Sequence, residues 1–337
     1  MRGVNHRSPL FSGPPAQRAL AGAVFVLGLC SVAPLLAWVY GLGSFAAWFW
    51  ALAAPGMLLV FVLALVLART GAFPDLRVGI AAGVLGGVVG TIGYDVIRMP
   101  FLAAGYRLFA PINSYGILIL GTTHSSPFSD LVGWLYNFAN GTMFGVAYGM
   151  IAIGRRWWMG IPWAFFLETM TIVTPYAAAY GIAGHPDIIA IAYLAHVAYG
   201  APLGLICMQA ARWTDDDGQP IPNWWALGGI LVVLVASNRP WDTQPRLAEA
   251  ESLGPAPATI ISGGKFVPEW VRVAQGGCVQ LKSEDRSAYD ITVPARAHVV
   301  AEGTLSVCFR DPGIKRVQLN GRPYSGGFVI VDASLKP

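Results

Sequence analysis

The chain has 337 residues, of which 55% are hydrophobic and only 12% are charged. About a quarter of the residues in soluble globular proteins are charged, so this composition argues against a soluble protein and for one embedded in a lipid bilayer. The net charge is only +4 and the arginines are scattered along the chain, which gives no support to a nucleic-acid partner.

Long apolar segments extend from the N-terminal region to residue 238. A helix needs about 20 mainly apolar residues to cross a bilayer. The segments that approach or exceed this length are 19–41, 46–68, 78–98, 131–153, 160–182, 187–211 and 223–238. Segment 112–121 is apolar but about half as long, which favours an interfacial or re-entrant element. We therefore predict a polytopic α-helical membrane domain at 19–238 with about seven transmembrane helices, preceded by a cytoplasmic segment at 1–18.

The arginines indicate how these helices are oriented. If the N-terminus is cytoplasmic, only Arg98 and Arg107 of the arginines before residue 239 fall on the outer side. Cytoplasmic loops carry the excess of Lys and Arg, so we predict a cytoplasmic N-terminus. An odd number of helices then places the C-terminal region outside, which in a bacterial inner membrane is the periplasm.

Small residues recur at every fourth position in two of the predicted helices. The first series is Gly79, Gly83 and Gly87, and the second is Gly133, Asn137, Gly141, Gly145 and Gly149. Small residues allow two backbones to approach closely where lipid provides no hydrophobic drive for helix association. We expect both series to form helix contacts.

Four polar residues, Asn137, Asn140, Glu168 and His196, are predicted to lie near the bilayer midplane, and together with Tyr193 and Tyr199 they form the predicted midplane cluster. Such groups are costly in a membrane and usually face the bundle interior or a cavity. Tyr193, His196 and Tyr199 are expected to share one helix face because they are three residues apart, and Thr174-Pro175 is expected to kink the helix beyond Glu168. Glu168 either forms a structural helix contact, protonated or paired with His196, or the cluster binds a proton, a ligand or a metal ion.

Further candidates lie toward the outer surface. Asp95 and Arg98 are three residues apart at the outer end of the third helix and are expected to form an ion pair. A long outer loop contains His124, and a second outer loop contains His185 and Asp187, so an outer-face metal site is one interpretation. No complete hydrolase or nucleotide-binding motif occurs, which favours a non-enzymatic role.

The C-terminal region has a different composition. All four lysines of the chain lie in it, and it begins with a linker at 239–258 that is rich in Pro, Ala and charge. From residue 259, short β-type runs alternate with Gly, Pro and Asp turns, which predicts an all-β Greek-key sandwich over 259–337. Cys278 and Cys308 lie in predicted strands of an extracytoplasmic domain, where disulfides persist. A disulfide and a pair of buried free thiols are the alternatives.

The order of these runs resembles that of a cupredoxin domain over about the last quarter of the chain. The similarity is carried by Phe266-Val267-Pro268, Val271, Val273, Gly276, the strand from Cys278, Cys308, Pro312-Gly313 and the run 326–331. A blue-copper centre needs two His, one Cys and a weak axial ligand. Ile314 stands where the family has histidine, and the remaining candidates are His298 with Asp290 or Tyr289. The resemblance therefore implies a cupredoxin-like domain that lacks its type 1 copper ligands. No cofactor is predicted, although copper is the metal the resemblance raises.

Three functions are compatible with these features. The favoured hypothesis is a non-catalytic membrane subunit or scaffold whose sandwich and outer loops dock a protein partner, such as a redox or copper-containing membrane complex. The first alternative is a transporter or channel for a proton, a metal ion or a small solute that uses the midplane cluster. The second alternative is a membrane metalloenzyme with an outer-face His/Asp site.

Overall fold

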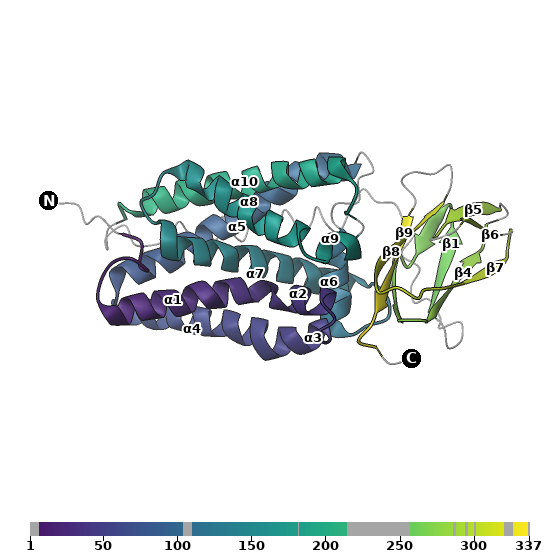
Figure 1. The fold of residues 1–337 in the computed structure, drawn as a ribbon, viewed down its shortest axis with the longest axis horizontal. Helices are drawn as coiled ribbons and strands as arrows, with labels where there is room; N and C mark the ends of the chain where they lie inside the picture. The colour runs from purple at the N-terminus through teal and green to yellow at the C-terminus, as the bar shows by residue number, and fades with distance from the viewer. Residues whose placement is uncertain are drawn as a thin grey trace.

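The computed structural model describes residues 7–103, 110–180, 182–213, 257–285, 288–293, 296–299, 301–319 and 326–335. Helices form the first part of the chain and strands the second, and the sandwich lies at one end of the helical bundle, opposite the N-terminus (Figure 1). The predicted helix at 223–238, Arg107 and nearly all of the predicted linker lie outside the described residues.

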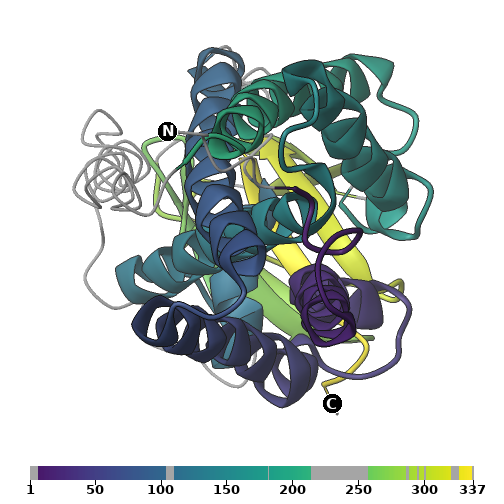
Figure 2. The ribbon, with the colours of Figure 1, turned by 90° about the vertical axis from the view of Figure 1, so that its left-hand side faces the viewer.

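The helices run side by side along the long axis of the molecule (Figures 1 and 2). They are α1 Pro15–Leu29, η1 Cys30–Val32, α2 Ala33–Val39, α3 Phe45–Trp48, η2 Phe49–Ala53, α4 Ala54–Thr70, α5 Pro74–Ala103, α6 Ala110–Leu120, α7 Pro127–Ala152, η3 Trp157–Met159, α8 Gly160–Ile172, α9 Tyr176–Ala179 and α10 Pro186–Ala210. Four stretches are long and apolar enough to cross a membrane, namely Pro15–Val39, Phe45–Thr70, Pro74–Phe101 and Pro186–Ala210. The described residues thus contain a helical region with four candidate membrane helices.

The segment predicted as one helix over 160–182 is interrupted. The helix α8 ends at Ile172, and the short α9 begins only at Tyr176. Pro175 lacks an N–H group and disfavours the helical conformation of Thr174, so the chain turns here instead of kinking within one helix. The prediction of a continuous fifth helix is therefore wrong. Segment 112–121 lies almost entirely within α6, whose Ile117 is fully buried.

The two series of small residues pack against each other. A Cβ atom added to Gly87 of α5 would lie 2.7 Å from the Cα of Thr142 in α7. One added to Gly145 of α7 would lie 2.6 Å from the Cα of Gly87. Real side chains do not fit at such separations, so glycine is what allows the two backbones to touch. The predicted role as helix contacts is confirmed for the glycines of both series, although Gly133 packs against Ile112 of α6 and not against α5.

The strands form two sheets, with orders β2-β1-β4-β7 and β3-β9-β8-β5-β6. Their bounds are β1 Ala258–Ser262, β2 Lys265–Val267, β3 Trp270–Ala274, β4 Cys278–Ser283, β5 Tyr289–Thr292, β6 Arg296–Val299, β7 Thr304–Cys308, β8 Gly313–Leu319 and β9 Gly326–Asp332. Pairing is mixed, since β1 pairs with β4 and β3 with β9 in parallel, and the other pairs are antiparallel. The predicted sandwich is present, and its Greek-key connection stays a prediction.

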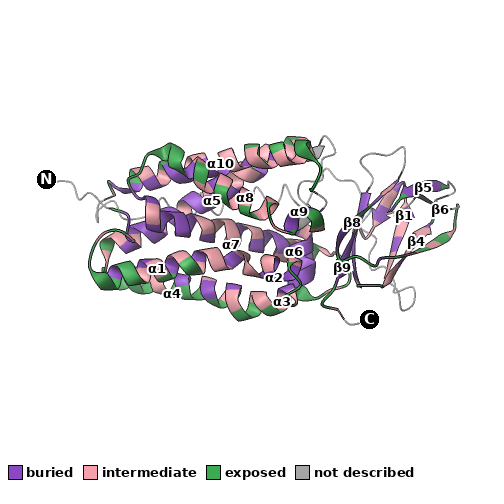
Figure 3. Cartoon of the chain, viewed as in Figure 1, coloured by how far each residue is buried: buried purple, intermediate pink, exposed green. Residues whose placement is uncertain are grey.

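Strand β9 is buried on both faces. Val329 and Val331 join the core between the two sheets. Phe328 and Ile330, which alternate with them, join a second core together with helical residues such as Trp38. Successive residues of a strand point to opposite faces, so one sheet packs on the helices as well as on its partner sheet. The sandwich is therefore joined to the end of the bundle through a shared hydrophobic core (Figure 3).

The loop between α6 and α7 strengthens this junction. The backbone N–H of Arg272 in β3 donates to the carbonyl of Thr123 over 2.6 Å, and the N–H of Ser125 donates to the carbonyl of Trp270 over 3.0 Å. His124 lies between them and forms a bridge with Val271. This connection, residues 121–126, thus pairs with the free edge of β3 as a short additional strand. It is much shorter than the outer loop predicted from sequence, because α6 occupies part of that segment.

Cys278 and Cys308 form a disulfide, as one of the two sequence-based alternatives predicted. They lie directly opposite each other in the antiparallel pair of β4 and β7. The bond joins two strands of the sheet that faces away from the helices.

Removing this disulfide should destabilise the sandwich. The bond closes a sequence separation of 30 residues, and constraining such a loop is worth roughly 3 kcal/mol. We expect a Cys278→Ser/Cys308→Ser variant of the full chain to be cleaved faster within the sandwich during limited proteolysis. A Cys30→Ala variant, which changes a free cysteine in the helical region, is the control. Equal cleavage rates in both variants would show that the bond contributes no stability.

Candidate functional site

A cavity of about 380 Å³ lies within the helical bundle. The stretch from α1 to α2 contributes only apolar residues to it, whereas α5, α6, α7, α8, α9 and α10 contribute polar ones. The polar lining residues are Thr91, Tyr94, Tyr115, Asn137, Asn140, Glu168, Thr171, Thr174, Tyr176, His196 and Tyr199. Five members of the predicted midplane cluster therefore line one cavity, and the sixth, Tyr193, does not.

Glu168 and His196 form the centre of the site. The carboxylate Oε2 of Glu168 lies 3.5 Å from Nε2 of His196. The other ring nitrogen, Nδ1, lies 2.9 Å from the carbonyl oxygen of Ala192. A carbonyl only accepts, so Nδ1 carries a hydrogen and Nε2 faces the carboxyl group. The pair can therefore hold one proton between Oε2 and Nε2 and is electrically neutral when it does.

The meeting of these two side chains follows from the packing of α8 on α10. A Cβ atom on Gly200 of α10 would lie 2.7 Å from the carbonyl carbon of Gly160 at the start of α8. Glu168 lies about two turns after Gly160 in α8, and His196 lies about one turn before Gly200 in α10. The two helices run in opposite directions (Figure 1), so moving forward along α8 from Gly160 and backward along α10 from Gly200 leads to the same region of the bundle. The close approach at the glycines thus brings the acid and the imidazole together.

Two amides extend the polar wall. Asn140 in α7 accepts a hydrogen bond through Oδ1 from the hydroxyl of Ser31, over 2.7 Å. The Nδ2 atom of Asn137, one turn earlier, is buried and has no hydrogen-bond partner among the described residues. A buried donor without a partner is unfavourable, and a ligand that accepts a hydrogen bond would satisfy it.

Tyr193 and Tyr199 point in different directions, contrary to the expected shared face. The hydroxyl of Tyr193 lies 2.8 Å from that of Thr169 in α8. The hydroxyl of Tyr199 lines the cavity and donates to the carbonyl of Gly141 in α7 over 2.7 Å. Six residues turn an α-helix by about 600°, which leaves the two side chains about 120° apart. The prediction of one face for all three residues is therefore wrong for Tyr193.

Asp95 and Arg98 lie behind the cavity wall and are buried. The Oδ1 atom of Asp95 is 4.0 Å from Nη1 of Arg98, which gives the predicted ion pair. The guanidinium group also lies over the ring of Tyr94, 4.7 Å from its centroid. Tyr94 in turn contacts the ring of His196 edge-on, with centroids 4.9 Å apart. Tyr94 thus connects this ion pair to the imidazole of the site.

The three outer-loop residues do not form a site. His124 is exposed in the loop that pairs with β3, whereas His185 and Asp187 are exposed at the start of α10. Across the described part of the chain, no three His, Cys, Asp or Glu side chains are grouped so that they could hold a metal ion. The geometry therefore gives no support to the outer-face metalloenzyme.

The sandwich residues do not fit copper. The sulfur of Cys308 is bonded to that of Cys278, so it cannot act as a thiolate ligand. Ile314 has no donor atom and packs in the core shared with the helices. Asp290 and Tyr289 lie on β5, where they pair in register with His298 and Val299 of β6. The copper chemistry that the cupredoxin resemblance raises therefore lacks its thiolate in this chain.

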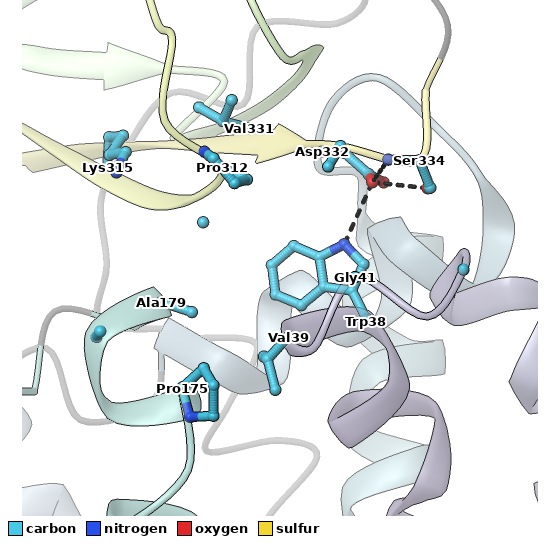
Figure 4. A pocket seen from close by; sticks show the side chains of 14 residues that line it. Trp38, Val39, Gly41, Pro175, Ala179, Pro312, Lys315, Val331, Asp332 and Ser334 are labelled. Atoms are coloured by element: carbon cyan, nitrogen blue, oxygen red, sulfur yellow. Dashed lines mark hydrogen bonds between the residues drawn. The ribbon is translucent and has the colours of Figure 1, made fainter.

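A second cavity, of about 350 Å³, lies where the sandwich meets the helices (Figure 4). The indole of Trp38 in α2 reaches across it and donates to Oδ1 of Asp332 over 3.3 Å. The same oxygen accepts from the backbone N–H and the hydroxyl of Ser334, over 2.8 and 2.6 Å. The other oxygen accepts from the guanidinium group of Arg272, including Nε over 3.0 Å.

Sequence reasoning missed this junction. Its signal was present in the consecutive apolar residues Phe328, Val329, Ile330 and Val331, because a strand that is apolar at successive positions is buried on both faces. The run was interpreted only as the last strand of a sandwich. The partner of its second face could be identified only in three dimensions.

Comparison with known proteins gives limited information. No family model matches the chain, and no curated protein matches it. Among solved structures, amicyanin from Paracoccus versutus is similar to the sandwich, with 15% identity over 23% of this chain and 83% of amicyanin and a TM-score of 0.22. A purple cupredoxin from Nitrosopumilus maritimus matches with 15% identity over 23% of this chain and 99% of that protein, with a TM-score of 0.21. The assignment of a two-sheet sandwich rests on the strand pairing itself.

Proposed function

We propose that the chain is an integral membrane protein that binds a small molecule inside its helical bundle, as a transporter or carrier does. The observation behind this proposal is that Glu168, His196 and the unpartnered amide of Asn137 face one cavity of about 380 Å³. Cavities of this volume are typical of small-molecule sites, in which a few placed polar groups set the orientation of the ligand. Of the functions compatible with the sequence, the transporter hypothesis uses these residues.

The docking-scaffold hypothesis receives less support from the geometry. The sheet face formed by β3, β9 and β8 packs against helices of the same chain. A partner protein would therefore have to bind the opposite sheet, β2-β1-β4-β7, or the loops. Docking of a redox or copper-containing complex stays a prediction.

We place the bundle across a membrane with the sandwich on its outer side. Arg69 at the end of α4 and Arg77 at the start of α5 flank the connection between these helices. Arg155 and Arg156 lie in the connection from α7 to α8, and Arg212 follows the end of α10. These connections lie at the end of the bundle away from the sandwich (Figure 1). The excess of positive charge marks the cytoplasmic side, which supports a cytoplasmic N-terminus and a periplasmic sandwich. In this orientation α10 ends on the cytoplasmic side, so the chain would have to cross the membrane once more before the sandwich. The predicted helix at 223–238, which lies outside the described residues, would supply that crossing.

Chemical modification of Glu168 tests the proposed site. Carbodiimides are small reagents that add to a protonated carboxyl group and leave a stable N-acylurea on it. The neutral Glu168–His196 pair has a form in which the carboxyl group holds the proton, so a cavity open to small molecules should allow the reaction. We expect one of two reagents, dicyclohexylcarbodiimide or a water-soluble cationic carbodiimide, to modify Glu168 in membranes that contain the full chain, as measured by peptide mass spectrometry.

Three comparisons define the outcome of this experiment. The Glu168→Gln variant should no longer be modified at this position. The Tyr193→Phe variant should still be modified at Glu168, because Tyr193 lies at the contact between α8 and α10 but outside the cavity. Asp95 is an internal reference, since its carboxyl group is fully buried and does not line the cavity. If neither reagent modifies Glu168 faster than Asp95, the proposed binding site does not exist.

A further inference from the structure

The mouth of the cavity lies among apolar side chains on the flank of the bundle. Phe166 and Met170 of α8 line the cavity, and yet they are 47% and 46% exposed. They are four residues apart, so they lie on one face of α8. Glu168 is two residues from each of them, so its side chain is turned about 160° around the helix from theirs and is buried in the bundle. Leu36 of α2 lines the same cavity and is partly exposed. These side chains form the rim between the surface of the bundle and the acid.

This rim would face the hydrocarbon of a bilayer. Phe166 and Met170 belong to α8, which packs lengthwise against α10, one of the four candidate membrane helices. Val173, at the end of α8, is 67% exposed and also apolar. Apolar side chains exposed along the flank of a membrane bundle contact lipid, so a molecule that passes between Phe166, Met170 and Leu36 comes from the bilayer.

The residues that line the interior of the cavity determine which polar head group such a molecule can carry. No Lys or Arg is among the described lining residues, and the one carboxyl group is paired with an imidazole. A head group with a full charge would therefore be buried without a counter-ion, which is costly. A neutral hydroxyl or carbonyl group can accept a hydrogen bond from Nδ2 of Asn137 and exchange one with Glu168 or His196.

We propose that the ligand is a lipid-soluble amphiphile with a neutral hydroxyl or carbonyl head, which reaches Glu168 sideways from the bilayer between α8 and α2. Its head binds the Glu168–His196 pair and Asn137, and its apolar part lies along Leu29, Val32 and Leu36. This inference rests on the proposed function, since it names the ligand class and the access route of the same cavity.

The access route is tested with the two carbodiimides in membranes that contain the full chain. Dicyclohexylcarbodiimide partitions into lipid, and the cationic reagent stays in water. We expect the lipid-soluble reagent to modify Glu168 roughly tenfold faster or more, because a charged reagent is excluded from the hydrocarbon. A Met170→Trp variant, which narrows the rim, should slow this reaction, and a Val173→Trp variant should not, because Val173 is exposed on the same helix but does not line the cavity.

The head group is tested by protection with ten-carbon amphiphiles. Decanol, decyl sulfate and decyltrimethylammonium share an apolar chain and differ in charge. We expect decanol to slow the modification of Glu168 by dicyclohexylcarbodiimide, and the two charged compounds at equal membrane concentration to protect much less. Protection by decyl sulfate or decyltrimethylammonium that equals that by decanol would overturn the assignment of a neutral head.

The outcomes separate the two proposals. Modification of Glu168 by the water-soluble reagent at an equal or higher rate would support the binding site and overturn lateral access from lipid. Modification by the lipid-soluble reagent without protection by decanol would leave the site in place and overturn the proposed ligand class. Absence of modification by both reagents would overturn the proposed function and this inference together.

Discussion

Replacing Asp332 with alanine should release the sandwich from the helices and raise amide hydrogen exchange in β9 by about two to three orders of magnitude. Asp332 is fully buried and accepts hydrogen bonds from Trp38, Arg272 and Ser334. Without it, the guanidinium group of Arg272 is left buried without its counter-ion. Removing one partner of a buried ion pair costs about 3–5 kcal/mol, and each 1.4 kcal/mol changes an equilibrium tenfold.

The sandwich contains a matched control for this variant. Lys282 and Glu284 form an ion pair at 3.7 Å whose side chains are 39% and 42% exposed. Exposed pairs contribute at most about 1 kcal/mol, so Glu284→Ala should change exchange little. Hydrogen–deuterium exchange of the full chain, read on peptides that contain Val329 to Val331, measures both variants. If the β9 amides exchange no faster in the Asp332→Ala variant than in the Glu284→Ala variant, the junction is not held by the ion pair of Arg272 and Asp332.

The same carboxyl group gives the junction a defined pH dependence. Burial on its own would raise the pKa of Asp332, but the hydrogen bonds from Ser334 and the positive charge of Arg272 outweigh it and hold the pKa below its usual value. A carboxyl group with a lowered pKa stabilises the folded state above the unfolded pKa of about 3.9, and this contribution is lost as the pH falls through the folded value. The protection of the β9 amides against hydrogen exchange should therefore be constant down to about pH 4 and decline below it. In an Asp332→Asn variant this decline should disappear.

Gly145→Ala should destabilise the helical bundle by about 1–3 kcal/mol or more. The added methyl group would lie 2.6 Å from the Cα and 2.7 Å from the N of Gly87. These are backbone atoms of a packed helix and cannot rotate away as a side chain can. The substitution would force α5 and α7 apart and weaken the contacts along their whole interface.

The control is the same substitution at Gly22 of α1. A Cβ atom there would have its nearest neighbour, the Cδ1 of Leu10, at 3.7 Å, which is an ordinary contact distance. Alanine favours a helix over glycine by about 1 kcal/mol, so Gly22→Ala should be neutral or slightly stabilising. Unfolding of both variants by SDS in mixed micelles, followed by circular dichroism, measures the difference. Equal midpoints of SDS unfolding for the Gly145→Ala and Gly22→Ala variants would contradict the close contact between α5 and α7.

The candidate site could be predicted in part from sequence. Glu168, His196, Asn137 and Asn140 were selected because polar groups within apolar segments are costly and therefore need a shared environment. The inclusion of Tyr193 failed because a three-residue spacing drifts by about 60° per step around a helix, which turns Tyr193 toward Thr169. The spacing of residues along a helix gives the angle between their side chains. It does not show which other helix packs against each side chain.

The interruption of α8 and the position of the sandwich were harder to predict. Thr174-Pro175 indicated a kink, but whether a proline bends or ends a helix depends on what satisfies the backbone groups around it. The resemblance of the tail to a cupredoxin predicted a sandwich but did not indicate which of its faces packs against other parts of the chain. The face that contains Phe328 and Ile330 is covered by Trp38 and the other helical residues of the shared core.

The amino-acid sequence by itself determined the long apolar helices, the use of two glycine series as helix contacts, the β-type tail and most residues of the polar cluster. These features follow from composition and local periodicity, which reflect whether each residue meets lipid, water or protein. Only the tertiary structure decided that Glu168 meets His196 in a cavity, that Phe166 and Met170 of α8 and Leu36 of α2 form the rim of this cavity, and that Asp332 joins the sandwich to Trp38. These contacts join residues far apart in the chain, and their geometry is set by helix and sheet packing that no local pattern records.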